Sequence, residues 1–235
     1  MNTQNMMDNA VDPDKWMYKV GGISGILVFI GYMIILALYI TAFPPSGTEA
    51  RLIFFAEHAT EWWSIIGLSV LTNFLRLLVF FSLFFALKGI NRNAALIAVA
   101  FEGLFVVLEC ATSYGAFFPA LMNLSGQYAA ATSDAQRAIY VAAATYIDAA
   151  LESGFGAVYV ILVPAISTIV ISFVMLKGIF RKSTAYLGLV AGILAVVSVV
   201  GSYFVSAMSN IVIISSTLEM VWFLLVGYRL YRLAR

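Results

Sequence analysis

Residues 62–121, WWSIIGLSVLTNFLRLLVFFSLFFALKGINRNAALIAVAFEGLFVVLECATSYGAFFPAL, consist of two long apolar stretches joined by a short polar turn at 88–93. A helix needs roughly 20 apolar residues to cross a hydrocarbon core about 30 Å thick, and each stretch exceeds that length. Lipid offers no hydrogen-bonding partners to the backbone, so a continuous apolar segment of this length crosses a membrane as a helix. These residues therefore predict a transmembrane helical hairpin.

The same apolar signal recurs along the rest of the chain. Of 235 residues, 63% are hydrophobic and 11% are charged, whereas soluble domains are about half apolar and about a quarter charged. We therefore expect an all-α polytopic membrane helical bundle with six transmembrane helices, formed by residues 18–235 after a cytoplasmic N-terminal tail of residues 1–17. The predicted spans are about 18–43, 62–87, 94–121, a fourth that ends at 175–176, 185–208 and 211–230.

The fourth crossing is preceded by a helical region that is too long for a single span. Ser133 and Gln136 form a capping-box start, and a helix from Ser133 to residue 177 would be about 66 Å long at about 1.5 Å per residue. We expect a break at residues 153–156 and a further kink at Pro164. An outer, amphipathic helical segment at about 133–152 would then lead into helix four.

The distribution of basic residues predicts the orientation. Lys and Arg concentrate in the cytoplasmic connections of membrane proteins, and here ten of them fall on one set of connections and two on the other. Both termini are therefore expected in the cytoplasm (N-in/C-in). The ten are Lys15, Lys19, Lys88, Arg92, Lys177, Arg181, Lys182, Arg229, Arg232 and Arg235, and the two are Arg51 and Arg137.

Small residues at a spacing of four predict where helices approach one another closely. Gly21-xxx-Gly25 opens the first span, and Gly188-xxx-Gly192 lies early in the fifth. Such pairs let two helix backbones come into contact.

Four charged residues fall within the predicted spans. Arg76, Glu109 and Glu219 lie near the middle of the second, third and sixth spans, and Glu102 lies on the cytoplasmic half of the third. Each costs roughly 2.5–3.5 kcal/mol or more at the bilayer centre unless it is paired, hydrated or neutralised. These residues should therefore face the bundle interior. Helical spacing gives each helix one polar line: Ser69, Asn73 and Arg76 on the second span, Glu102, Glu109 and Ser113 on the third, and Ser215 and Glu219 on the sixth.

Arg76 is the single cation within the spans, so we expect it to pair with Glu109 or Glu219. Glu102, close to the inner interface, is expected to be partly hydrated. One Arg against three Glu leaves a charge of minus two if all ionise, so one or two carboxyl groups should be protonated or bound to a cation. Buried carboxyl groups that bind a proton or a cation are typical of a proton relay or a cation-coupled carrier. A structural Arg–Glu pair explains the same residues equally well.

Asp148 and Glu152 are four residues apart, which places both carboxylates on one face of the outer helical segment. In one interpretation they form an outer acidic mouth that gathers cations. In the other, which the lack of ligand geometry favours, they belong to a solvated helix face.

Several chemistries need residues that the predicted spans lack. His58 is the sole histidine and lies in an outer connection, and every lysine lies at a helix end or outside the spans. Serine–histidine catalysis, haem or zinc ligation by several histidines and Schiff-base chemistry within the bundle are thus excluded. The chain also contains no phosphate-binding loop. No catalytic residue, metal site or cofactor is predicted.

Three hypotheses about function remain. The first is a proton- or cation-responsive carrier or channel whose site contains Arg76, Glu109, Glu219, Glu102, Asn73 and Ser113. The second is a non-catalytic accessory or scaffold subunit in which the charges are structural. The third, which the missing catalytic residues make the weakest, is an intramembrane lipid-modifying enzyme. The expected partners are the lipid bilayer and either a protein subunit or a second copy of the chain, without nucleic acid.

Two connections carry a resemblance to a known family. The turn NRNAAL at 91–96 and the segment FRKSTAYLG at 180–188, together with the acidic start of the outer connection after Phe43, resemble domain-of-unknown-function family 4386. Its members are prokaryotic six-helix membrane proteins. The resemblance implies a multi-pass protein of a bacterial or archaeal plasma membrane. It implies no activity and no functional residue.

Overall fold

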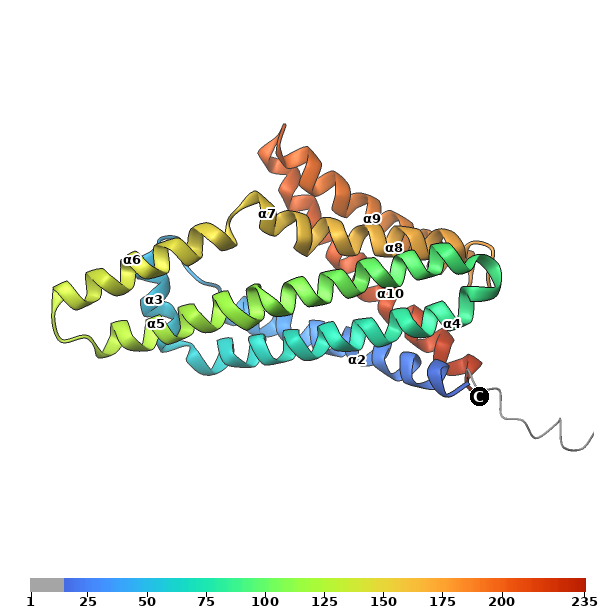
Figure 1. Cartoon of the computed structure of the whole chain (residues 1–235), viewed down its shortest axis with the longest axis horizontal. Helices are drawn as coiled ribbons and strands as arrows, with labels where there is room; N and C mark the ends of the chain where they lie inside the picture. Colours follow the sequence, from blue (N-terminus) through green and yellow to red (C-terminus); the bar gives the residue numbers. More distant parts are fainter. Residues whose placement is uncertain (1–14) are drawn as a thin grey trace, which may run out of the picture.

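The computed structural model describes residues 15–235, and this part of the chain is helical without strands (Figure 1). The first described helix begins at Lys15, before the predicted boundary at residue 18, and the rest of the predicted tail lies outside the described residues. The elements are α2 (Lys15–Thr41), α3 (Thr48–Glu57), α4 (Ala59–Ala111), η1 (Ser113–Phe117), α5 (Phe118–Ala130), α6 (Asp134–Leu151), α7 (Gly154–Ala157), η2 (Val158–Leu162), α8 (Val163–Met175), α9 (Lys182–Ser202), η3 (Ser206–Asn210) and α10 (Ile211–Leu233). η1 and η2 are π-helical, and η3 is a 3₁₀-helix.

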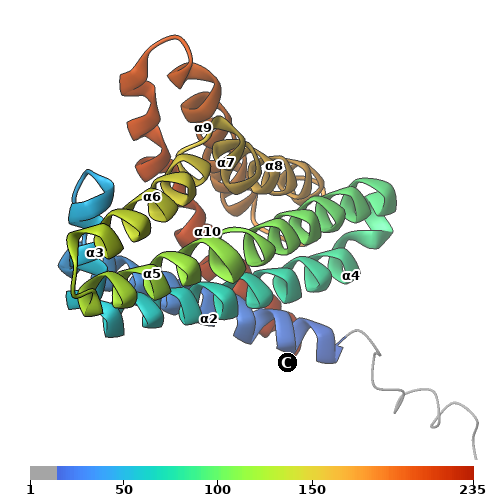
Figure 2. The same ribbon diagram turned by 60° about the vertical axis from the view of Figure 1, so that its left-hand side comes forward.

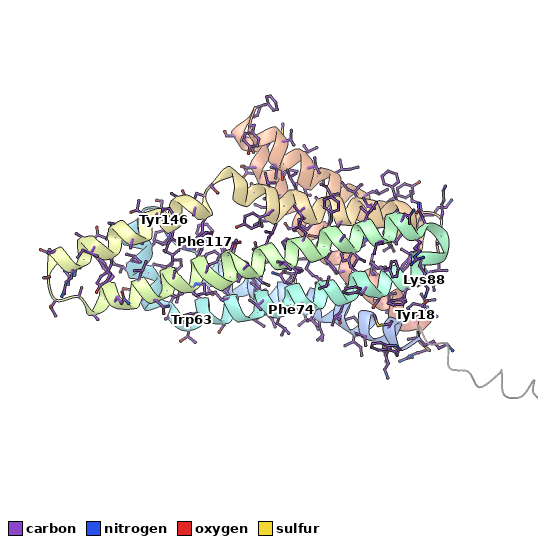
Figure 3. All side chains as sticks on the ribbon, in the orientation of Figure 1. Tyr18, Trp63, Phe74, Lys88, Phe117 and Tyr146 are labelled. Atoms are coloured by element: carbon purple, nitrogen blue, oxygen red, sulfur yellow. The ribbon has the colours of Figure 1, made fainter. Side chains whose placement is uncertain are left out.

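Five helical segments in the described part of the chain are long and apolar enough to cross a membrane. Large hydrophobic side chains cover their outer surfaces, such as Trp63 and Phe74 on α4, which are 46% and 54% exposed (Figure 3). A soluble protein would bury more of this surface, so the molecule is built for a lipid environment. The segments are Lys15–Thr41, Ala59–Ala130, Val158–Met175, Lys182–Ser202 and Ser206–Leu233.

The longest of these segments folds back on itself within α4. Asn91 has a non-helical backbone (φ −153°, ψ 90°), and the ribbon reverses direction there (Figure 1). The side-chain oxygen of Asn91 accepts a hydrogen bond from the backbone N–H of Ala94 at 3.1 Å, which caps the start of the returning arm. The turn predicted at 88–93 therefore joins two antiparallel arms, 59–90 and 92–111.

One end of the bundle collects the start of α2, the fold-back of α4, the α8–α9 connection and the C-terminus (Figures 1 and 2). These segments carry the ten basic residues counted above, so we call this the basic end. The opposite end is called the distal end.

The second arm of α4 extends beyond the predicted third span. It continues through η1 and α5 to Ala130 instead of ending near Leu121, and residues 92–130 span about 58 Å at about 1.5 Å per residue. Its distal part packs against α3 and α6. These three helices, α3, α5 and α6, form what we call the distal lobe.

A compact apolar core holds the distal lobe to the bundle. Trp62 packs against Phe55 and Phe118, and its indole N–H donates to the Ala42 carbonyl at 3.2 Å. The hydroxyl of Ser125 donates to the Leu52 carbonyl, which links α5 to α3. This distal core comprises Ala42, Leu52, Phe55, Trp62, Ile65, Ile66, Leu121, Met122, Tyr128 and Ala144.

The residues of the segment predicted at about 133–152 form the helix α6, and the predicted cap at Ser133 is confirmed. The Ser133 hydroxyl accepts from the backbone N–H of Gln136 at 3.3 Å. α6 packs against α5 and α3 instead of lying alone on a surface.

The predicted break before helix four is also confirmed. α6 ends at Leu151, the short α7 follows at Gly154, and the π-helical turn η2 lies directly before Pro164. Proline has no N–H and its ring crowds the carbonyl four residues earlier, so the widened turn relieves that crowding.

A second apolar core fills the basic half of the bundle between α2, α4, α8, α9 and α10. Its members include Val79, Phe80, Ile171, Trp222 and Val226, all almost inaccessible to solvent. We call it the basic-end core. Between this core and the distal core lies a level of buried polar side chains that includes Asn73, Arg76, Glu102 and Glu109, which we call the polar layer.

The glycine spacings mark close helix contacts, as predicted. A Cβ atom added to Gly25 would lie 2.7 Å from the Cα of Gly227, so α2 and α10 approach backbone to backbone. A Cβ atom on Gly188 would lie 2.5 Å from the indole nitrogen of Trp222. These contacts hold α10 against α2 and α9 on the basic side of the polar layer.

The Gly25–Gly227 contact leads to a stability prediction. Gly25→Ile should lower the free energy of unfolding by about 1–3 kcal/mol, because the added side chain has no room between the two backbones. Thermal unfolding in detergent checks this. Gly67→Ile is the matched control, since a Cβ atom there meets open space, and equal melting temperatures for the two variants would contradict the assigned packing.

Candidate functional site

Arg76 lies in the polar layer and is almost fully buried, with 3% of its surface exposed. Its Nε donates to Glu102 Oε1 at 2.7 Å and its Nη2 to Glu219 Oε1 at 3.2 Å. Its Nη1 donates to the Tyr32 hydroxyl at 2.7 Å. All three guanidinium nitrogens are thus engaged. We call Arg76, Glu102, Glu219 and Tyr32 the Arg76 cluster.

Two aromatic rings enclose the guanidinium group of the Arg76 cluster. The central guanidinium carbon lies 4.7 Å from the ring centre of Phe105 and 5.0 Å from that of Phe223. A cation over an aromatic face is attracted by the negative face of the ring. The charge of Arg76 is therefore stabilised by carboxylates at its edges and by rings over its faces.

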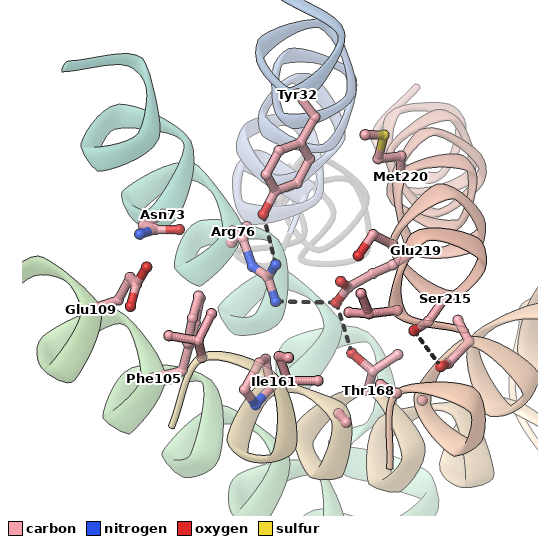
Figure 4. Close-up of a pocket in the computed structure, with 18 of the residues that line it drawn as sticks. Tyr32, Asn73, Arg76, Phe105, Glu109, Ile161, Thr168, Ser215, Glu219 and Met220 are labelled. Atoms are coloured by element: carbon pink, nitrogen blue, oxygen red, sulfur yellow. Dashed lines mark hydrogen bonds and ion pairs between the residues drawn. The ribbon is translucent and has the colours of Figure 1, made fainter. Parts of the chain in front are cut away.

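The four members of the cluster come from three helices. Arg76 and Glu102 lie on the two arms of α4, Tyr32 on α2 and Glu219 on α10. Glu219 also accepts a hydrogen bond from the Thr168 hydroxyl of α8 at 3.3 Å. The charges therefore connect α4 to α2, α8 and α10 at one level (Figure 4).

The predicted pairing of Arg76 is confirmed for Glu219 but not for Glu109. The expectation that Glu102 is hydrated near the interface is wrong, because Glu102 has no exposed surface and binds Arg76 directly. The hairpin places Glu102 level with Arg76, whereas Glu109 lies seven residues farther along the same arm. At about 1.5 Å per residue, Glu109 is about 10 Å closer to the distal end.

Glu109 has a separate environment in the same layer. It is 5% exposed and accepts a hydrogen bond from the Ser113 hydroxyl at 3.1 Å, as the predicted stripe requires. The Ser113 hydroxyl lies 3.3 Å from that of Tyr159, which also accepts from the Thr112 hydroxyl at 3.1 Å. Within residues 15–235, Glu109 has no ion pair.

Asn73 is the other predicted site residue on this face. It is 4% exposed, and its side-chain nitrogen has no hydrogen-bond partner in the described part of the chain. A buried amide without a partner costs about 1–3 kcal/mol. Asn73 and Glu109 lie together on the α4 side of the site, across from Glu219 and Ser215 on α10 (Figure 4).

A cavity of about 330 Å³ connects these groups. Its polar lining includes Asn73, Arg76 and Glu109 from α4, with Ser215, Ser216 and Glu219 from α10. The rest of the wall is mainly apolar and aromatic and comes from all the helices around the cavity, with the polar side chains of Ser69 and Thr168 among it.

The cavity is closed toward the basic end and extends toward the distal end. On every helix that lines it, the lining residues lie at the level of Arg76 or on its distal side, and the basic-end core fills the bundle below. The side chain of Glu219 is 23% exposed, and Ser216 is exposed. The α9–α10 hairpin leans away from α2 and α4 toward its distal tip (Figures 1 and 2).

Asp148 and Glu152 lie in the distal lobe rather than in this cavity. Both bind Arg51 of α3, at 2.7 Å and 3.1 Å, and Asp148 is only 6% exposed. Asp148 is therefore not on a solvated face, and the shared cation argues against an open acidic mouth. Burial disfavours the charged form of Arg51, but the two carboxylates outweigh that effect and raise the pKa of Arg51 above its ordinary value.

Sequence reasoning missed several residues of the site. Tyr32 and Thr168 bind Arg76 and Glu219, and Tyr159 extends the Glu109 chain. Each lies in an apolar stretch without charges, where a hydroxyl carries little signal. Arg51 was counted as an outer residue, and its spacing from the acidic pair of more than 90 residues gave no indication of contact.

Comparisons of the chain with models of known families, with curated proteins and with solved structures found no match. The resemblance to family 4386 stays a prediction.

The geometry of the cluster predicts that Arg76 and Glu102 act as a structural unit. Arg76→Met should destabilise the fold by about 3–5 kcal/mol, since it leaves the fully buried Glu102 without a cation. Adding Glu102→Gln should recover most of that loss. Thermal unfolding in one detergent measures both, with Arg137→Met as a control at an exposed ion pair.

A double variant no more stable than Arg76→Met would contradict this assignment. So would a single variant as stable as the wild type.

Proposed function

We propose that the protein is a small membrane carrier that binds a proton or another cation at Glu109 and Glu219. The observation that carries this proposal is the one-sided cavity that reaches both carboxylates and ends on the Arg76 cluster. A purely structural charge cluster needs no cavity, because buried ion pairs are most stable when they are tightly packed and fully bonded.

The proposal includes six crossings with both termini in the cytoplasm. The two arms of α4 and its continuation, 59–90 and 92–130, measure about 48 and 58 Å at about 1.5 Å per residue, and each exceeds the hydrocarbon thickness of about 30 Å. The positive-inside rule places the basic end in the cytoplasm. The distal lobe then projects outward, and the cavity faces the outer side. The resemblance to family 4386 supports a prokaryotic plasma membrane.

The three carboxylates have different surroundings, which suits a division of roles. Glu102 is buried beside Arg76 and fixes its position. Glu219 gives one oxygen to Arg76 and Thr168 and is partly exposed to the cavity. Among the described residues, the Ser113 hydroxyl is the one side chain that donates a hydrogen bond to the Glu109 carboxylate. Glu109 and Glu219 are the groups that a proton or cation entering from the distal side reaches.

The ion pair between Arg76 and Glu219 can couple the binding of a proton or cation to a movement of helices. A proton or cation on Glu219 weakens its attraction to Arg76, and that attraction holds α10 to α4 at the cavity floor. A ligand moves a conformational equilibrium only through its different affinity for the two states. Neutralising Glu219 supplies that difference, so the α9–α10 hairpin is the element we expect to move.

A scaffold or accessory subunit is the second candidate. The enclosure of Arg76 by Glu102, Tyr32 and two rings favours a structural role for that part of the cluster. The lipid-modifying enzyme has no comparable support, since the carboxylates are not accompanied by a histidine or an activated nucleophile.

Flux through reconstituted protein tests the carrier. Vesicles that contain the purified protein and a pH-sensitive dye should dissipate an imposed proton, Na⁺ or K⁺ gradient faster than protein-free vesicles. Glu109→Gln and Glu219→Gln should each reduce that rate about tenfold, the effect of removing about 1.4 kcal/mol of favourable interaction.

Glu61→Gln serves as the control, because this carboxylate is exposed at the start of α4 and does not line the cavity. Wild-type flux equal to that of empty vesicles under all three gradients would reject a carrier of protons, Na⁺ or K⁺. Equal flux through the wild type and both cavity variants would reject the assigned residues.

A further inference from the structure

We infer that the ligand of the central cavity is a small organic cation with an apolar body, held between Glu109 and Glu219. This inference deepens the proposed function and rests on it for the step of transport. The binding step is testable by itself.

The charges around the cavity determine the sign of the ligand. Arg76 has no free nitrogen, is 3% exposed and is covered by two rings, so it cannot offer its charge to an anion. The available groups are the Glu109 carboxylate and the second oxygen of Glu219. With all four groups ionised, one Arg and three Glu leave a net charge of minus two, which a cationic ligand reduces.

The walls of the cavity distinguish an organic cation from a metal ion. Within residues 15–235, no three His, Cys, Asp or Glu side chains are grouped so that they could hold a metal. The rings of Tyr32, Phe105 and Tyr114 line the cavity together with aliphatic side chains such as Ile161 and Val212. Aromatic faces bind organic ammonium groups, and aliphatic walls bind the apolar body of such a molecule.

The volume limits the size of the ligand. Ligand pockets in proteins range from about 300 to 1,000 Å³, so a cavity of about 330 Å³ lies at the small end. One ring or a short chain beside the cationic group fits this space.

Binding of benzyltrimethylammonium to the full chain in nanodiscs tests the sign of the charge. Isothermal titration calorimetry should show binding at least about tenfold tighter than for benzyl methyl sulfone, which is neutral, or phenylmethanesulfonate, which is anionic. Glu109→Gln and Glu219→Gln should each weaken binding of the cation about tenfold, while Glu61→Gln leaves it unchanged. The comparison of the three compounds uses the wild type alone, so it does not depend on the folding of a variant.

The combined outcomes separate this inference from the proposed carrier. If the wild type does not bind benzyltrimethylammonium, or binds the neutral or anionic compound as tightly, the ligand class is wrong even where flux depends on Glu109 and Glu219. If the cation binds with the stated dependence, and protein-containing vesicles take up neither benzyltrimethylammonium nor protons, Na⁺ or K⁺ faster than empty vesicles, the ligand class stands and the carrier is rejected.

Discussion

The guanidinium charge of Arg76 has to be neutralised in the middle of an apolar bundle, and the arrangement of the surrounding helices follows from that requirement. Its side chain contacts two carboxylates, a tyrosine hydroxyl and two aromatic ring faces, which belong to residues of α2, α4 and α10. Leaving such a charge unpaired in hydrocarbon costs several kcal/mol. The cluster therefore fixes the relative level of these helices, and the two glycine contacts on its basic side fix their separation.

Two dry apolar cores confine the polar chemistry to one layer. The basic-end core closes the bundle below Arg76, and the distal core joins α3 and α5 to the ends of α2 and α4. Between them, the π-helical turns η1 and η2 lie against each other through Ser113, Thr112 and Tyr159. Single π turns break the regular helical pattern and often occur at functional sites. Here they widen the helices beside the cavity, where regular helices would pack more closely.

Much of the fold can be predicted from the composition and the spacing of residues. Which side chains pair within the site cannot, because that depends on how the helices are aligned with one another in space. The turn at 88–93, the break at 153–156 and the glycine contacts have local signals and are confirmed. The apolar stretches form five helical segments long enough to cross a membrane in the described part of the chain, and one of them continues past its predicted end near Leu121. The sequence analysis places Glu102 too close to the cytoplasmic interface, because the number of residues from the 88–93 turn measures depth in the membrane only roughly. In the structure, the register of the two hairpin arms brings Glu102 level with Arg76. Tyr32 and Arg51 were missed because a lone hydroxyl and a pair separated by 97 residues leave no periodic signal.

In the proposed carrier, the cavity opens only toward the distal end and reaches the Arg76 cluster. Cysteines placed in a Cys110→Ala background and treated with a membrane-impermeant thiol reagent test it most directly. Ser216→Cys, on the cavity wall, should react from the distal side of the bilayer. Thr217→Cys, exposed on the helix but not on the cavity wall, and Ser172→Cys, fully buried, should not. Reaction of Ser216→Cys from the basic side alone, or no faster than that of Thr217→Cys, would contradict the account.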